Sequence, residues 1–287
     1  MMDSAIPGKG RAATPKFVSQ TIVYLLLIMA ALIIFFPLLN ILIVSLNVEK
    51  ELVTNPLNIP QRFNLDNYIY AWEKSKFLLY FFNTVFVCIC TVTCNVIFTS
   101  MASYAISRFN YRGIKLSYYY FIMGIFVPIQ VIILPLFKTL KIIGLLNTLF
   151  GMALVYTATT MPLSILLFTG FFKTIPRELD ESALVDGCRP LQCFWAIIFP
   201  LSRVIIASAT VLICLEIWRD FFIPLVITIS PLKKTLAVGL LNFMSDFAVE
   251  WTKFSAAMVI QVIPIIVIFL SLQKYFVKGE ISGAIKG

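Results

Sequence analysis

Long runs of apolar residues make up most of the chain, and short polar segments separate them. A helix needs roughly 20 apolar residues to cross the hydrocarbon core of a bilayer, and runs of about this length recur from end to end. We predict membrane-spanning helices at 21–46, 77–106, 116–137, 148–172, 201–229 and 254–277. This is the pattern of an all-α integral membrane protein with six transmembrane helices.

Prolines interrupt five of the six predicted spans. Each proline removes a backbone hydrogen bond and bends its helix, which a bilayer tolerates only where a neighbouring helix or a cavity satisfies the freed carbonyl. We therefore expect a bundle with a polar interior, although hydrogen bonds between helices explain any one polar residue equally well. The polar residues that fit this interior are Asn83, Asn95, Gln130, Thr157, Thr159, Thr160 and Gln261.

The composition excludes a soluble domain and several kinds of active site. Residues of the hydrophobic types make up 60% of the chain and charged residues 13%, more apolar surface than a soluble fold of 287 residues can bury. The chain has no histidine, the commonest general base and metal ligand, and its six cysteines form no Cys-x-x-Cys pair. We expect buried, unpaired cysteines and no catalytic residue, metal or cofactor on this chain.

The net charge of +9 is spread over the short loops. This distribution favours a role in membrane topology and argues against binding of nucleic acid. The tight loop 107–115 carries Arg108, Arg112 and Lys115 close to two spans, where the positive-inside rule has most weight. The rule places this loop, the 173–200 loop and both termini in the cytoplasm.

The stretch "ELDESALVDG" at 178–187 is acidic in a basic chain. Glu178 and Asp180 follow Pro176 and lie where a helix dipole favours negative charge, and Gly187 is typical of a helix C-terminus. The pattern predicts a helix too short to be stable alone, so it should dock on a partner. A second helix should follow from Pro190, with one apolar face, made by Leu191, Phe194, Trp195 and Ile198, that lies along the membrane or the bundle.

The same loop resembles a known motif. Its spacing is similar to the E-A-A-x-x-x-G-x(9)-I-x-L-P loop of binding-protein-dependent ABC importer permeases, with Ser182 where the family usually has Ala and Phe199 where it has Leu. Other segments look like the MalG-like branch, which imports carbohydrates: "NLDNYIYAW", "ASYAISRFNYRG", "VPIQVIILPLF", "LLNTLFGMALVY", "EIWRDFFIPLVI" and "QKYFVKGEISGAIKG". The matching residues of the loop are Glu181, Ser182, Ala183, Gly187, Ile197 and Pro200.

The resemblance implies a permease domain at 78–277 whose 173–200 loop seats a coupling helix on an ATPase subunit. The N-terminal tail, first helix and outer loop would occupy 1–77, and 278–287 would be a cytoplasmic tail. Implied partners are a second related permease, an ATPase dimer that carries ATP and Mg²⁺, an extracytoplasmic sugar-binding protein and the lipid of a bacterial cytoplasmic (inner) membrane. The expected ATPase contacts are Asp180, Glu181, Ser182, Ala183, Gly187 and Pro200 in the loop, and Gly283, Ala284 and Lys286 in the tail.

Two further sets of residues are candidates on the other side of the membrane. The run "EIWRD" places charge within a span, which indicates an outer gate or substrate path, a local salt bridge being the alternative. Its members are Glu216, Trp218, Arg219 and Asp220, and the branch commonly has Asn in place of Arg219. In the outer loop 230–253, the resemblance implies that Asn242 and Ser245 contact the binding protein.

Two other functions are compatible with a multispan chain. A secondary transporter or channel driven by an ion gradient would favour ionisable residues near mid-bilayer and symmetric halves. An intramembrane enzyme would need a paired nucleophile and base or a metal set, which a chain without histidine does not provide. The chain also has no Walker A pattern, so ATP hydrolysis is expected on another subunit.

Overall fold

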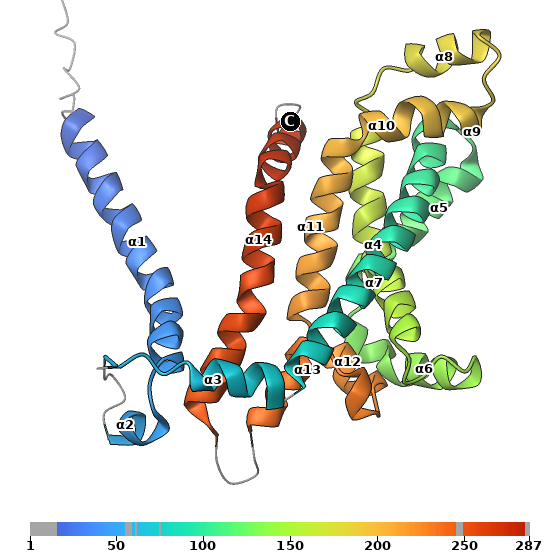
Figure 1. The fold of residues 1–287 in the computed structure, drawn as a ribbon. Coiled ribbons are helices and arrows are strands. Elements are labelled where there is room, and N and C mark those ends of the chain that lie inside the picture. Colours follow the sequence, from blue (N-terminus) through green and yellow to red (C-terminus); the bar gives the residue numbers. More distant parts are fainter. Residues whose placement is uncertain (1–15, 55–58, 61, 75, 245–248, 285–287) are drawn as a thin grey trace, which may run out of the picture.

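The computed structural model describes residues 16–54, 59–60, 62–74, 76–244 and 249–284, and these residues fold into helices joined by short turns (Figure 1). Within these ranges no β-strand forms, apart from an isolated antiparallel bridge between Met244 and Val249. Four of the helices are long and apolar enough to cross a bilayer: α1 (Lys16–Ser45), α4 (Phe77–Arg108), α7 (Leu149–Phe172) and α14 (Trp251–Ala284). They confirm the spans predicted at 21–46, 77–106, 148–172 and 254–277.

The third predicted span is bent. α5 (Arg112–Met123) and the 3₁₀ turn Gly124–Phe126 meet α6 (Ile129–Ile142) at 106°, so 116–137 is two helices and not one straight span. Pro128 lies at the break with extended backbone and supplies no N–H for a continuing helix. Apolar composition does not reveal this bend, because it measures hydrophobicity and not direction.

The fifth predicted span is also divided. α11 (Arg203–Arg219) ends before Asp220, whose backbone is extended, and α12 (Phe222–Ile227) follows. At its other end α11 meets the segment Pro190–Leu201 at 75°. The described residues thus hold four unbroken candidate spans, or up to six if each bent pair counts as one span.

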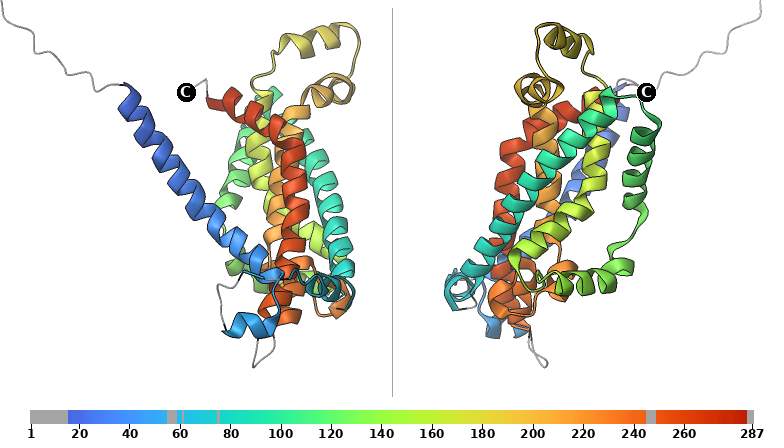
Figure 2. Two further views of the ribbon diagram at one scale, coloured as in Figure 1. Left: turned by 60° about the vertical axis from the view of Figure 1, so that its left-hand side comes forward. Right: turned by 90° about the vertical axis from the view of Figure 1, so that its right-hand side faces the viewer.

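The helices form a bundle with one outlying member. α4 and α7 pack along much of their length, α11 and α14 lie beside them, and α1 leans away from the bundle (Figures 1 and 2). α1 touches α14, and every side chain from residue 20 to residue 39 is exposed. Because these side chains are nearly all apolar, α1 is built to face lipid or another subunit.

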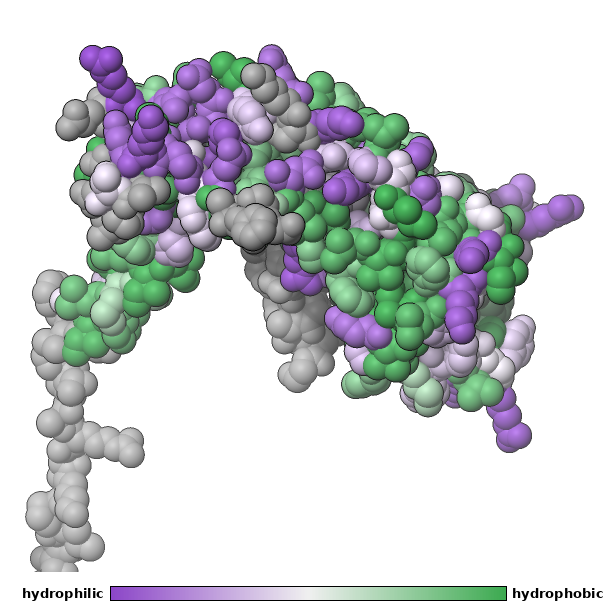
Figure 3. All heavy atoms as spheres, turned by 90° about the horizontal axis from the view of Figure 1, so that it is seen from below, coloured by the Kyte–Doolittle hydropathy of each residue, from purple (hydrophilic) through white to green (hydrophobic). Residues whose placement is uncertain are grey.

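Two ends of the bundle can be distinguished. The α8 end carries α8 (Glu178–Val185), α9 (Pro190–Cys193), α10 (Phe199–Leu201), the start of α1 and the end of α14 (Figure 1). The α2 end carries α2 (Glu49–Thr54), α3 (Asp66–Ile69), α6, α12 and α13 (Leu236–Gly239). Seen from the α2 end, hydrophilic and hydrophobic side chains are mixed on the surface (Figure 3).

The core has one apolar cluster towards each end. The cluster of the α2 end includes Phe77, Tyr80, Tyr156, Trp218 and Phe243. The cluster of the α8 end includes Tyr104, Phe168, Phe172, Phe194 and Ile198.

Polar side chains join α4 to α7 between these two clusters. Asn95 Nδ2 donates to Thr160 Oγ1 at 2.9 Å, and Ser103 Oγ donates to the carbonyl of Ile165 at 3.3 Å. These bonds fix the register of α4 against α7.

Candidate functional site

The acidic stretch forms the helix α8, shorter at each end than the sequence suggests. Three acidic residues lie in its first turn, where the helix dipole favours them. Past its end Gly187 has φ +83°, a left-handed conformation that glycine adopts without strain, and its N–H donates to the carbonyl of Leu184. The chain then turns back, and Cys188 N–H closes the turn on the carbonyl of Ala183.

One face of α8 is turned towards the chain's own bundle. Asp180 and Ala183 are buried, with 9% and 4% of their surface exposed. Oδ2 of Asp180 forms an ion pair with Nε of Arg108 at 2.8 Å, and Oδ1 accepts a hydrogen bond of 2.6 Å from the Tyr104 hydroxyl. The carboxylate of Asp180, expected at the ATPase contact, therefore points away from the free face of the helix.

The same ion pair holds the segments on both sides of α8. Arg108 also donates from Nη1 to the carbonyl of Ile175 at 3.2 Å, just before the helix. The thiol of Cys193 in α9 donates to Asp180 Oδ1 at 3.4 Å. Burial and this hydrogen bond raise the pKa of the Cys193 thiol, which keeps it protonated as a donor.

The rest of the α8 surface is open, although Glu181 and Leu184 also border a hollow of about 170 Å³ beside Asp180. Glu181 and Ser182 are exposed, as are Leu184 at 51% and Val185 at 87%. An apolar pair flanked by acidic side chains is a surface that basic and apolar groups of another protein would fit. Glu181, Ser182 and Gly187 lie on this side, whereas Pro200 is exposed in α10, nearer the membrane helices.

The helix after α8 buries a narrower face than predicted. Phe194 and Ile198 are buried, but Leu191 and Trp195 remain exposed at 56% and 40%. The segment Phe194–Ile198 is a π-helix, whose wider turn brings Cys193 and Ile198 to the same side. Phe194 and Ile198 of the predicted apolar face thus pack on the bundle, whereas Leu191 and Trp195 do not.

A groove between α7 and α11 contains part of the "EIWRD" run. It has a volume of about 310 Å³ and a mixed lining. Glu216 and Arg219 lie at the groove and pair with each other, both exposed. The groove's other polar residues are Thr159, Thr160 and Ser164, and its apolar residues include Leu163, Leu167 and Leu212.

Trp218 and Asp220 have other partners. Trp218 is 2% exposed, its indole N–H donates to the carbonyl of Gln261 at 2.8 Å, and its ring meets Phe81 edge-on. Asp220 accepts hydrogen bonds from the Tyr156 hydroxyl at 2.7 Å and from the backbone N–H of Phe222 at 2.9 Å. The run therefore divides by helical geometry: its first and fourth residues reach the groove, and its third and fifth hold the fold.

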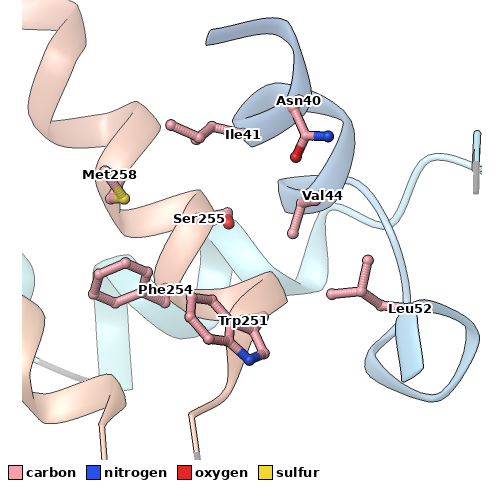
Figure 4. Close-up of a pocket in the computed structure, with 8 residues that line it drawn as sticks. All are labelled: Asn40, Ile41, Val44, Leu52, Trp251, Phe254, Ser255 and Met258. Carbon is pink, nitrogen blue, oxygen red and sulfur yellow. The ribbon is translucent and has the colours of Figure 1, made fainter. Parts of the chain in front are cut away.

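A second hollow, of about 470 Å³, lies between α1, α2 and α14 (Figure 4). Asn40 and Ser255 contribute polar atoms, and the other side chains are largely apolar, including Phe254 and Met258. This lining suits an apolar group better than a hydroxyl-rich one.

The remaining candidates lie at the two ends. Asn242 is exposed at the α2 end and donates to the Tyr80 hydroxyl at 3.2 Å. Gly283 and Ala284 form the last turn of α14, and Ser245 and Lys286 lie outside the described residues. Within the described ranges no group of three or more Cys, Asp or Glu side chains is placed to hold a metal ion.

The sequence did not identify Tyr104 and Arg108 as partners of α8. Arg108 counted only as a topological charge. A signal was present, since an arginine at the end of a span needs a partner wherever it is buried, but its partner lies 72 positions further along the chain.

Comparison with known proteins identifies one family, to which the matching relatives also point. The model of the family "Binding-protein-dependent transport system inner membrane component" matches residues 95–281. The "Melibiose/raffinose/stachyose import permease protein MelC" of Bacillus subtilis is 31% identical over 278 residues, 96% of this chain and 100% of that protein. The "Sulfoquinovosyl glycerol transport system permease protein SmoH" of Agrobacterium fabrum is 30% identical, over 88% of this chain and 89% of that protein.

A solved structure has the same fold. It is titled "Crystal structure of a bacterial ABC transporter involved in the import of the acidic polysaccharide alginate" and matches with a TM-score of 0.82 at 24% identity, covering 94% of this chain and all of that one. Family, relatives and fold favour an importer permease over the ion-driven transporter and the intramembrane enzyme. The chain belongs to the binding-protein-dependent transport system inner membrane components, the permease subunits of ABC importers.

Proposed function

We propose that this permease imports a sugar or oligosaccharide and is driven by an ATPase that docks on the open face of α8. The observation that carries the docking is the exposed surface of Glu181, Leu184 and Val185 on a helix held rigidly at its other face. When its partner moves, a rigid helix of this kind transmits the movement to the bundle as a rigid-body displacement.

The substrate class rests on the relatives and on the groove. The relatives' names include melibiose, raffinose, stachyose and arabinooligosaccharides. Three hydroxyl side chains beside apolar ones, as at Thr159, Thr160 and Ser164, suit the mixed polar and apolar surface of a sugar. In this proposal ATP-driven movement of α8 alternately exposes the groove to the two sides of the membrane.

The proposed assembly contains a second related permease, two ATPase subunits that bind ATP and Mg²⁺, and an extracytoplasmic sugar-binding protein. The α8 end and both termini face the cytoplasm, and the α2 end, with Asn242, faces the binding protein. The exposed length of α1 supports a neighbour in the membrane, and the arginines near the α8 end support this orientation.

The test is a charge reversal on the open face of α8. We expect Glu181→Lys to abolish uptake and sugar-stimulated ATP hydrolysis, because it places a positive charge where the ATPase is proposed to meet a negative one. Glu178→Lys makes the same change one turn earlier and serves as the matched control, with a smaller loss. Purified complexes in proteoliposomes, with the binding protein and candidate sugars, supply both readouts. Normal uptake in Glu181→Lys contradicts the docking, and no stimulation by any sugar contradicts the substrate class.

A further inference from the structure

The contact between α8 and α4 differs from every other ion pair in the described part of the chain. Three ion pairs occur there. Two of them, Arg219–Glu216 and Lys253–Glu250, join residues that are three positions apart in the sequence. Arg108–Asp180 joins distant elements, and its side chains are 8% and 12% exposed, against 28–73% for the members of the other two pairs. Water therefore screens the charges of this pair less than those of the other two pairs.

We propose that Asp180 is a positioning residue: clamped by Arg108 and Tyr104, it carries the movement of α8 into α4 and does not itself touch the ATPase. The proposal rests on the proposed docking of an ATPase on α8. It goes beyond that function in one respect: Asp180 transmits the movement of α8 to α4 and does not bind the ATPase.

The contacts of Asp180 define the orientation of α8 relative to α4 as well as the distance between the two helices. Tyr104 and Arg108 lie four residues apart on one face of α4, and each engages a different oxygen of Asp180. Arg108 also holds the carbonyl of Ile175, and Arg177 Nη2 reaches the carbonyl of Ser107 at 3.5 Å. Rotation of α8 relative to α4 would break several of these bonds together.

Stability alone does not explain such a pair. Burying two charges costs desolvation energy that offsets most of their attraction, so an apolar pair of the same size would hold the helices as well. The ion pair and the hydrogen bond from the Tyr104 hydroxyl together give the contact a defined geometry. A clamp with fixed geometry is what a helix that transmits movement requires.

A series of contacts connects the clamp at Asp180 to the groove between α7 and α11. From Arg108 the helix α4 runs back to Asn95, whose amide donates to the Thr160 hydroxyl at 2.9 Å. Thr160 lines the groove between α7 and α11. Displacement of α4 by α8 thereby reaches a residue of the proposed sugar path by way of one interhelical hydrogen bond.

The test compares Asp180→Asn with Asp186→Asn in the complete transporter. Asp186 follows the same helix and is exposed, so its substitution removes the same charge without touching the clamp. Sugar molecules taken up per ATP hydrolysed are measured in proteoliposomes, with ATPase content measured by co-purification. We expect Asp180→Asn to lower this ratio at least tenfold with normal ATPase content, Asp180→Glu to recover part of it, and Asp186→Asn to leave it unchanged.

Two results would overturn the clamp. One is a wild-type ratio in Asp180→Asn. The other is loss of the ATPase from Asp180→Asn but not from Arg108→Gln, which would make Asp180 a docking residue. If Asp180→Asn does not assemble, Tyr104→Phe removes one hydrogen bond and no charge, and a ratio equal to wild type again rejects the proposal. Whether the ATPase docks on α8 at all is tested separately, with the Glu181→Lys variant.

Discussion

The two ends of the bundle are held together by different means. At the α2 end, neutral and acidic side chains bind backbone groups of the neighbouring loops: Asn83 donates to the carbonyls of Leu232 and Lys234, and Asn147 accepts from the N–H groups of Ile229 and Ser230. At the α8 end, a buried ion pair between side chains connects α8 to α4.

From this difference we infer that the α2 end stays fixed during transport and that α8 moves. A loop bound at its backbone by several side chains is held at several points, so we expect the α2 end to stay fixed. A helix held along one face, with the rest of its surface open, can move as a unit without loss of its own structure. Substitutions at the α2 end should therefore lower stability and leave coupling intact.

The largest effect on stability is expected from Asp220→Ala. The substitution removes the acceptor for two N–H groups at the start of α12 and leaves the buried hydroxyl of Tyr156 without its partner. Loss of a cap and of a buried hydrogen bond together should cost about 2–3 kcal/mol. The unfolding temperature of the purified complex measures it, and Tyr156→Phe isolates the hydroxyl. A fall in uptake per ATP without loss of stability would break the comparison between the ends.

A smaller effect is expected from Thr84→Val, which keeps shape and removes one hydroxyl. Thr84 Oγ1 accepts from the buried N–H of Leu236 at 3.0 Å, and no other acceptor for that N–H replaces it. An unpaired buried donor costs about 1–2 kcal/mol. Thr157→Val is the matched control, because the Thr157 hydroxyl only donates to a carbonyl of its own helix. Equal stability of the two variants would show that the bond to the loop contributes nothing.

Much of the fold was readable from the sequence because hydrophobic length alone decides a spanning helix. α4 and α7 begin and end within two residues of the prediction. The prolines predicted that spans bend but not which of them break. Pro128 lies at the break before α6, whereas Pro162 lies inside an unbroken α7, and α11 ends at Asp220, which is not a proline.

The candidate sites were only partly readable for a related reason. The resemblance placed Asp180, Glu181 and Ala183 together at the ATPase contact, but of these three only Glu181 is exposed. Ala183 is buried, and Asp180 became a clamp residue through Arg108, far away in sequence. The run "EIWRD" was taken as one set, whereas the partners Gln261 and Tyr156 come from other helices and divide it. Long-range partners leave no local pattern.

Trp218→Phe should have a modest effect on stability. It removes the hydrogen bond from the indole to the Gln261 carbonyl and keeps an aromatic ring against Phe81. The expected loss is about 0.5–1.5 kcal/mol, since the carbonyl lies within α14 and keeps its helix bond. Trp251→Phe, at a ring that is 53% exposed, is the control. Altered sugar selectivity in Trp218→Phe at unchanged stability would restore Trp218 to the substrate path.

The smallest effect on stability is expected from Arg219→Asn, and it is the one that tests the groove. The Arg219–Glu216 pair is exposed and spans three positions of one helix, so its loss should change stability by about 0–1 kcal/mol. Because both residues lie at the groove, uptake should nevertheless slow. Glu250→Gln breaks the other pair of residues three positions apart, which is partly buried and away from the groove, and it should not affect uptake. Initial uptake rates over a range of sugar concentrations make the comparison. Matching rates for wild type and Arg219→Asn would reduce the pair to a surface salt bridge and remove "EIWRD" from the substrate path altogether, leaving the hydroxyls of α7 as the groove's polar contacts.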